Sequence, residues 1–226
     1  MKKYELTNET IEYKGKKLYR IKALIDFGNV EKGARGGFVE KEENLSMSGN
    51  AWVCDNARVC DNARVCGDAN VCGDAFVSGD AQVSGDAFVC GNAWVCDNAR
   101  VCGDANVCGN AWVCDNAQVS GDARVSGNAQ VSGDARVCGD ANVCGDAQVD
   151  KSINYAVIKG FGTCYRSTTF FRCQDKTVKV SCGCFLGTID EFRNQVKNTR
   201  GGKIAKEYLM IADLMEIHFS EDGYDG

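Results

Sequence analysis

The chain of 226 residues contains no proline, a single histidine, and no stretch that approaches 18 consecutive apolar residues. We therefore expect no membrane span. The opening MKKYELTNET also lacks the apolar segment of a secretory signal, so the sequence predicts a cytoplasmic location. In that compartment the fifteen cysteines are expected to be free thiols and not a disulfide framework. The lack of proline is typical of strands that form an uninterrupted hydrogen-bonded ladder.

Positive charge is scarce in the middle of the chain. Residues 46–149 contain thirteen Asp, five Arg and no Lys or Glu, so this segment carries −8 while the whole chain carries −5. Proteins that coat nucleic acids need Lys and Arg to neutralise phosphates. We therefore expect no direct nucleic-acid binding.

A six-residue repeat fills this acidic segment. Alanine recurs at every sixth position from Ala51 to Ala147, and valine does the same from Val53 to Val149. Within each A-x-V the period of two predicts a short strand with Ala and Val inward, and the Gly-Asp, Gly-Asn or Asp-Asn that follows predicts a turn. Six residues is the period of hexapeptide β-helices, in which three repeats form one triangular coil. The sequence therefore predicts a mainly β protein, with a left-handed parallel β-helix of about six coils at residues 45–152.

Residues 18 apart lie above one another in such a helix, which sorts the outward positions into three faces. Face one carries Trp52, Asn70, Phe88, Asn106, Arg124 and Asn142; face two carries Arg58, Phe76, Trp94, Trp112, Gln130 and Gln148; face three carries Arg64, Gln82, Arg100, Gln118 and Arg136. The outward aromatic side chains all lie on faces one and two. We expect them to bind a protein partner or a second copy of the chain: Trp52, Phe76, Phe88, Trp94 and Trp112.

The corner after face three carries a row of aspartates, the acidic edge: Asp68, Asp86, Asp104, Asp122 and Asp140. Carboxylates about 5 Å apart repel by roughly 1 kcal/mol per neighbouring pair even in water, so something is expected to offset them. Pairing with Arg64, Arg100 and Arg136, each four residues before an aspartate, is the favoured explanation. There are two alternatives. The edge could bind divalent cations, or it could imitate DNA phosphates and bind a nucleic-acid-binding protein.

Cysteine or serine follows almost every valine of the repeat. On face one Cys54, Cys72, Cys90 and Cys108 are consecutive, whereas on face three cysteine alternates with serine. Cys and Ser could fill a narrow slot interchangeably, the thiol-rich side could be covered by the C-terminal part or another subunit, or stacked thiolates could bind Cu(I) or Zn. Disulfides between stacked neighbours fit the spacing but not the reducing compartment. Because a single ladder seldom directs four sulfurs at one ion, we expect no metal and no cofactor.

The repeat lacks histidine, the residue on which the enzymes of this fold class depend. Acyl transfer and zinc-dependent hydration, which are common among hexapeptide β-helices, rely on histidine as base or ligand, and the single histidine, His218, lies outside the repeats. We expect no catalytic residue in the β-helix and no enzymatic activity.

The flanks lack the six-residue period. Residues 1–44 are expected to form a cap built on a hairpin from Tyr4 to Leu24, because the open end of a β-helix exposes unpaired strand edges. Residues 153–226 are expected to form a hairpin that turns at 174–176 and then two helices, the first opened by a capping box from Thr188 to Glu191.

This C-terminal module offers two chemical candidates. Arg166, Thr168, Arg172 and Arg200 could bind an anion through guanidinium and hydroxyl groups. Four thiols could form a zinc site, but their spacing matches no common zinc finger, so we expect them to be core thiols: Cys164, Cys173, Cys182 and Cys184.

Three segments resemble a group of bacterial and phage-associated hexapeptide-repeat proteins of unknown function: GARGGFVEKEENLSMSGNAWV, ARVSGNAQVSGDA, and TTFFRCQDKTVKVSCGCFLGTIDEF followed by AKEYL. The resemblance spans nearly the whole chain. It implies a left-handed β-helix and a bacterial or prophage origin, and it supplies no reaction.

Two functions of different classes agree with these observations. The favoured one is a non-enzymatic scaffold or interaction protein, which could be phage-encoded and act on a host protein, and which self-associates or binds a partner through its aromatic and Cys-rich faces. The alternative is a small-molecule or nucleotide-binding protein, or an acyltransferase-like enzyme, with its site at the C-terminal module or at a subunit interface.

Overall fold

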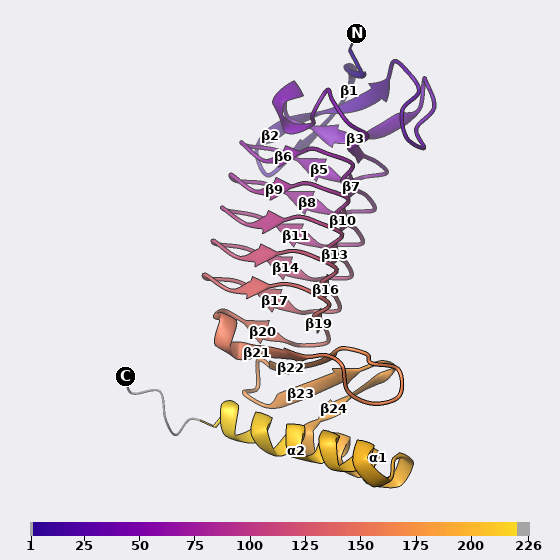
Figure 1. Ribbon diagram of the computed structural model, residues 1–226. Helices are drawn as coiled ribbons and strands as arrows, with labels where there is room; N and C mark the ends of the chain where they lie inside the picture. The colour runs from indigo at the N-terminus through magenta and orange to yellow at the C-terminus, as the bar shows by residue number, and fades with distance from the viewer. Residues whose placement is uncertain (1, 221–226) are drawn as a thin grey trace.

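The computed structural model describes residues 2–220, which form a long three-sided rod with a cap at each end (Figure 1). Parallel strands of two residues stack along the rod into three sheets, one on each side. Face one contains β4 (Trp52–Val53), β7 (Asn70–Val71), β10 (Phe88–Val89), β13 (Asn106–Val107), β16 (Arg124–Val125) and β19 (Asn142–Val143). Face two contains β5 (Arg58–Val59), β8 (Phe76–Val77), β11 (Trp94–Val95), β14 (Trp112–Val113), β17 (Gln130–Val131) and β20 (Gln148–Val149). Face three contains β6 (Arg64–Val65), β9 (Gln82–Val83), β12 (Arg100–Val101), β15 (Gln118–Val119) and β18 (Arg136–Val137).

The register of the coils follows directly from the repeat. Each strand pairs with the strand 18 residues away, as Phe88 does with Asn70 on one side and Asn106 on the other. The valines of the repeat are 0% exposed and its alanines are at most 1% exposed, so one column of small apolar side chains fills the rod. Because each coil buries only three valines and three alanines, its stability depends on stacking against neighbouring coils. The predicted parallel β-helix of about six coils is confirmed.

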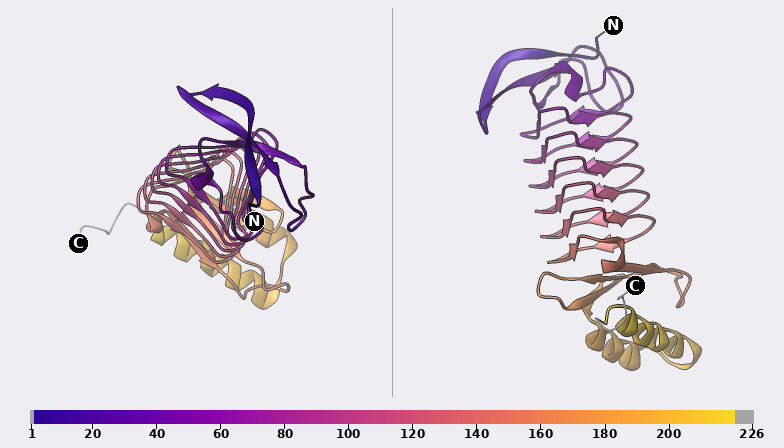
Figure 2. Two further views of the ribbon diagram at one scale, coloured as in Figure 1. Left: turned by 90° about the horizontal axis from the view of Figure 1, so that it is seen from above. Right: turned by 90° about the vertical axis from the view of Figure 1, so that its left-hand side faces the viewer.

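The N-terminal cap, residues 2–44, continues the sheet of face two. β1 (Tyr4–Tyr13) and β2 (Lys16–Ala23) form the predicted hairpin, and β3 (Arg35–Val39) pairs antiparallel with β2 and parallel with β5. A short 3-10 helix, η1 (Glu42–Asn44), then leads into the first coil. The hairpin projects beside the rod when the molecule is seen from above (Figure 2).

Two glycines let the cap approach the first coil closely. A Cβ atom on Gly37 would lie 2.6 Å from the carbonyl oxygen of Ala57, and one on Gly36 would lie 2.5 Å from that of Val53. These separations are shorter than van der Waals contact, so the strand requires residues without side chains. Lys3 is also buried here and donates to the Ala51 carbonyl oxygen at 2.9 Å.

The C-terminal module, residues 153–220, closes the other end of the rod. After η2 (Ser152–Asn154), a four-stranded antiparallel sheet is formed by β21 (Tyr155–Ile158), β22 (Thr168–Arg172), β23 (Val178–Cys182) and β24 (Phe185–Thr188). Phe171 and Cys173 belong to the same buried cluster as the rod's alanines and valines, so they plug the end of its core. Helices α1 (Ile189–Thr199) and α2 (Gly202–His218) lie beyond the sheet (Figure 1). Neither helix, nor any other in residues 2–220, is long and apolar enough to span a membrane.

The hairpin, the capping box and both helices agree with the sequence prediction. Thr188 Oγ1 accepts from the Glu191 amide, and the Glu191 carboxylate accepts from the Thr188 amide. Strand β24 was not predicted, because FLGT is too short to show a period. The module plugs the end of the rod and does not cover its thiol-rich side, so that interpretation of the cysteines fails for the C-terminal part.

Candidate functional site

The aromatic ladder on face two consists of Phe76, Trp94 and Trp112. The ring centroids of successive members are 5.4 and 5.5 Å apart, and both pairs meet edge to face. The N-terminal hairpin covers one end of this ladder: Tyr13 packs on Phe76 with a centroid distance of 5.1 Å. Lys14, at the tip of the same hairpin, lies over Trp94. Only Trp112, which is 40% exposed, is largely left open.

The remaining two aromatic side chains lie on face one and differ from each other. Trp52 is 4% exposed, because Tyr4 and Phe27 of the cap pack against it. Phe88 is 37% exposed, and its strand partners on the adjacent coils are Asn70 and Asn106. The expectation that all five aromatics bind a partner is therefore corrected for Trp52 and Phe76, which the chain's own cap buries. The sequence missed this because it shows the rod's faces but not the direction in which the hairpin folds.

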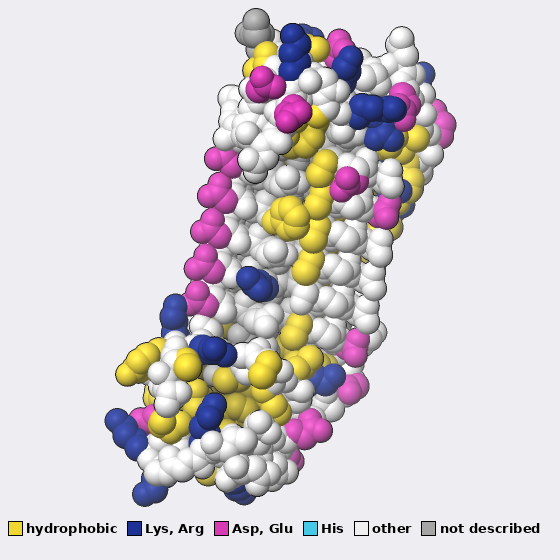
Figure 3. Space-filling view, turned by 90° about the vertical axis from the view of Figure 1, so that its right-hand side faces the viewer, with side chains coloured by type: hydrophobic (Ala, Val, Ile, Leu, Met, Phe, Trp, Pro, Cys, Tyr) yellow, Lys and Arg dark blue, Asp and Glu magenta, His cyan; other side chains and the backbone are white. Residues whose placement is uncertain are grey.

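The acidic edge forms a continuous row along one corner of the rod (Figure 3). Lysines of the two caps compensate its ends. Lys159 pairs with Asp140 at one end, and Lys3 lies near Asp68 at the other. Burial lowers the pKa of Lys3 to about 8, and the negative charge of Asp68 raises that pKa by a smaller amount. Bonding to Lys159 also lowers the pKa of Asp140. Within residues 2–220 no ion pair joins Arg64, Arg100 or Arg136 to this edge. The expected arginine pairing is therefore wrong, since these side chains extend from face three into solvent.

A thiol ladder runs along face one, made of Cys54, Cys72, Cys90 and Cys108. The four residues occupy successive coils, and their side chains are half-buried. All cysteines of residues 2–220 are free thiols. Burial, with smaller contributions from Cys72 and Asp55, raises the pKa of Cys54 to about 12. The Cys54 thiol is therefore protonated at neutral pH and is a poor nucleophile in the absence of a metal ion.

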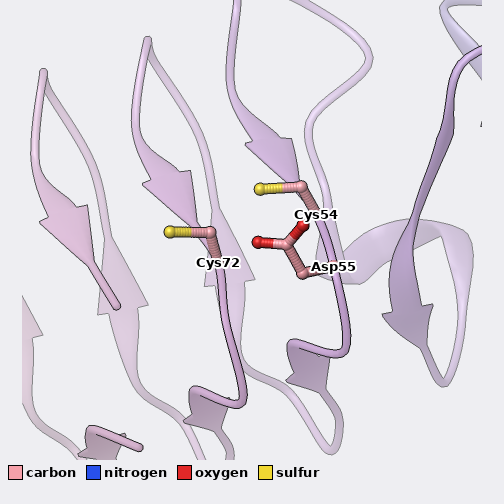
Figure 4. A group of neighbouring side chains, drawn as sticks. All are labelled: Cys54, Asp55 and Cys72. Atoms are coloured by element: carbon pink, nitrogen blue, oxygen red, sulfur yellow. The ribbon is translucent and has the colours of Figure 1, made fainter. Parts of the chain in front are cut away.

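Aspartate replaces glycine at four turns of the rod, and each time the preceding residue is cysteine: Asp55, Asp61, Asp97 and Asp115. All four adopt the left-handed conformation, with φ between 56° and 61°. Their carboxylates reach the next coil, as when Asp115 Oδ2 accepts from the Gly133 amide at 3.0 Å. At these turns, three groups of side chains bring thiols and carboxylates within 4.8 Å of one another. One of them joins Cys54, Asp55 and Cys72 (Figure 4). The pairing of Cys with the Asp-Asn turn was visible in the sequence, but its meaning depends on contacts between coils.

A cavity of about 290 Å³ lies in the C-terminal module, bordered by the loop before β22, the β23–β24 turn and α1. Arg166 and Arg200 line it together with the rings of Phe185, Phe192 and Tyr208. Burial is the main cause of the raised pKa of Tyr208. The Tyr208 hydroxyl donates a hydrogen bond to the carbonyl oxygen of Phe161 at 3.2 Å. Two guanidinium groups beside aromatic rings form a surface suited to a small anion or a flat anionic molecule.

The other members of the predicted anion site lie elsewhere. Thr168 is 2% exposed, and its hydroxyl contacts the Cys182 sulfur at 3.2 Å. Arg172 donates to the carbonyl oxygen of Phe219 at 2.7 Å and so ties down the end of α2. The structure therefore brings together two of the four predicted residues. Cys173 lies in the core of the rod, whereas Cys164, Cys182 and Cys184 line the cavity. The expectation that all four are core thiols is therefore wrong for Cys164 and Cys184, which are exposed.

The outer face of α2 carries an apolar row that was not predicted from the sequence. Met210, Leu214 and Ile217 are 70, 55 and 71% exposed, whereas the opposite side of the helix is buried against the sheet and α1. Their spacing of four and three residues places them on one side of the helix. The same spacing also occurs among the buried residues of α2, so the sequence did not show which side faces outward.

Comparison with known proteins agrees with the solenoid fold. A family model described as "YdcK Beta solenoid repeat" matches four segments of the rod, residues 57–73, 81–97, 117–133 and 129–145. All four segments lie within the repeat, so the similarity is to a β-solenoid repeat and extends to neither cap. No curated protein matches the chain.

Proposed function

We propose that the protein is a non-enzymatic β-solenoid scaffold that acts in the cytoplasm and associates with a second copy of itself through the outer face of α2. The observation that carries this proposal is the exposed apolar row Met210, Leu214 and Ile217. Contiguous apolar surface of this kind marks an interaction site in a protein with a well-packed core elsewhere.

The charges beside the row favour a second copy as the occupant. Lys206 and Asp213 lie two helical turns apart on the same flank of the row. An antiparallel two-fold pairing of α2 with itself therefore places each Lys206 opposite Asp213 of the second copy. Arg193 bridges Asp213 and Glu216 but neutralises only one of these two carboxylates, so the C-terminal half of the helix keeps negative charge for this contact.

Light scattering on the full chain under reducing conditions tests the proposal. We expect a dimer for the wild type and a folded monomer for Met210→Lys combined with Ile217→Lys. The control combines Asn194→Lys with Asn198→Lys, two exposed residues one turn apart on α1, and should remain dimeric. A monomeric wild type, or a dimer that the α2 variant leaves intact, would contradict this interface. In the second case Trp94→Glu with Trp112→Glu tests whether face two is the assembly surface.

The cavity of the C-terminal module supports a second candidate function, the binding of a small anion or nucleotide. It rests on the convergence of Arg166 and Arg200 beside Phe185 and Tyr208. The single histidine, His218, packs against Phe219 and does not line the cavity, which favours binding over acyl transfer.

Thermal unfolding with inorganic phosphate and a set of nucleoside monophosphates tests this candidate. Stabilisation by one of these probes that disappears in Arg166→Gln with Arg200→Gln would support it. Arg64→Gln on face three controls for nonspecific charge effects. Equal responses from wild type and the double variant would count against it.

A further inference from the structure

The thiol ladder on face one has a spacing set by the rod itself. Consecutive coils are one strand spacing apart, about 4.8 Å, and the ladder places one thiol on each of four coils. The ligand atoms of Cys54, Asp55 and Cys72 all lie within 4.8 Å of one another. The Cys54 and Cys72 side chains project to the same side of the rod (Figure 4). Farther along face one, Cys90 and Cys108 directly follow Val89 and Val107, which pair in adjacent coils.

This spacing matches a particular coordination geometry. A metal–thiolate bond is about 2.3 Å long, so two bonds laid end to end span about 4.6 Å. A linear two-coordinate ion therefore fits between thiols on adjacent coils with almost no movement of the backbone. Ions that prefer soft thiolate ligands include Cu(I).

Zinc fits the same residues poorly. Tetrahedral zinc requires four ligands. The turn supplies two thiols and one carboxylate, and Asp55 Oδ2 is already accepting a hydrogen bond from the Gly73 amide at 3.0 Å. The ladder thus favours an ion that needs only two sulfur ligands.

We propose that adjacent thiols of face one bind soft monovalent ions of the Cu(I) type, one between Cys54 and Cys72 and one between Cys90 and Cys108. On face two, Cys96 and Cys114 also occupy adjacent coils and form a third pair of the same kind. Each Cu(I) forms two Cu–S bonds, and the two S–H bonds break to release two protons to solvent. No electron is transferred, and the charge of each pair changes from zero to −1. This inference is independent of the proposed self-association.

Face three supplies the matched control. Its cysteines, Cys66, Cys102 and Cys138, are separated by serines on the intervening coils, so neighbouring thiols are two strand spacings apart. A linear ion cannot bridge about 9.6 Å. Removing thiols from face three should therefore leave Cu(I) binding by the ladder unchanged.

The experiment is anaerobic titration of the full chain with Cu(I) in the presence of a competing Cu(I) chelator. The test variant, Cys72→Ser with Cys108→Ser, leaves three thiols on face one, Cys54, Cys90 and Cys144, and no two of them occupy adjacent coils. The control variant, Cys66→Ser with Cys102→Ser, removes the same number of thiols from face three. We expect the test variant to hold two fewer ions per chain than the control, and X-ray absorption of the wild type to show two sulfur neighbours per copper. Serine already occupies this slot in other repeats, so both variants should fold, and circular dichroism verifies that they do.

Equal copper retention by the test and control variants would overturn the proposal, as would copper with three or four sulfur neighbours. If the variant with serine at both Cys72 and Cys108 is misfolded, the single variant Cys72→Ser serves as the test. It should retain one Cu(I) ion fewer per chain than the wild type. Asp55→Asn separates thiolate binding from carboxylate coordination. It should strengthen binding of the anionic bis-thiolate complex by removing a neighbouring negative charge, whereas a carboxylate ligand predicts weaker binding.

Discussion

The ammonium nitrogen of Lys14, at the tip of the N-terminal hairpin, lies 3.9 Å from the ring centroid of Trp94 in the third coil of face two. The same nitrogen lies 4.9 Å from the ring of Phe76. A cation over aromatic rings is attracted by their negative faces. Together with the packing of Tyr13 on Phe76, this contact holds the hairpin tip against face two and covers part of the aromatic ladder.

Lys14→Ala should release the hairpin tip and expose Trp94. A cation–π contact at a partly exposed position contributes about 0.5–1 kcal/mol, so the free energy of unfolding should fall by that amount. Urea unfolding measures the loss, and tryptophan fluorescence quenching by acrylamide measures the exposure. Lys22→Ala, at an exposed position on the same hairpin, should leave both values at those of the wild type. Unchanged quenching in Lys14→Ala would show that the hairpin is held by other contacts.

Gly37→Ala should destabilise the junction between the cap and the first coil. The added Cβ would lie 2.6 Å from the Ala57 carbonyl oxygen and 2.8 Å from the Val53 side chain, so β3 must shift away from the coil. Overpacking of this kind costs about 1–3 kcal/mol. Gly33→Ala, where nothing lies within 4 Å of the new Cβ, provides a comparison for the loss of glycine alone. Because Gly33 has a φ of 91°, that variant reports backbone strain without a steric clash.

The turn at Asp115 separates two effects of an aspartate in the left-handed conformation. Asp115→Ala loses the hydrogen bond to the Gly133 amide and keeps an unfavourable φ of 58°, so it should cost about 1–2 kcal/mol. Asp115→Gly loses the same bond but relieves the strain, so its unfolding free energy should lie near that of the wild type. Urea denaturation of the two variants gives the comparison. Equal losses would show that backbone conformation contributes nothing at this turn.

Alkaline pH should weaken the rod through its thiols. Burial raises the pKa of Cys54 and Cys96 to about 12 and that of Cys90 and Cys114 to about 11, whereas an unperturbed thiol has a pKa of 9.0. The folded state therefore holds protons that the unfolded state releases above pH 9. Stability from these groups is complete below pH 9 and declines as pH rises toward 11.

Urea midpoints at pH 7.5 and pH 10, with reductant present, measure this decline. The variant with serine at positions 54, 90, 96 and 114 should lose less stability over the interval than the wild type. Lys3 acts in the opposite direction, since burial lowers its pKa to about 8 and its cost to the folded state disappears at higher pH. A wild type whose midpoint rises from pH 7.5 to pH 10 would mean that Lys3 outweighs the thiols.

Much of the fold was predictable because the repeat is strict. Every pairing of residues 18 apart on the three faces agrees with the observed register, from Trp52 with Asn70 to Gln130 with Gln148. The candidate sites were less predictable. Arg166 and Arg200 meet at the cavity, but Thr168 and Arg172 do not, because the fold of the module determines which ends of its strands and helices converge.

The amino-acid sequence by itself determined the coils, their number, the inward Ala and Val, and the rows of like residues along each face and edge. These follow from local periodicity, since a period of six forces identical neighbours to stack. Only the tertiary structure decided that the N-terminal hairpin buries Phe76 and Trp52, that lysines of the two caps compensate the ends of the acidic edge, and that α2 turns Met210, Leu214 and Ile217 outward. Each of these depends on packing between segments far apart in the chain, where no repeat relates one position to the other.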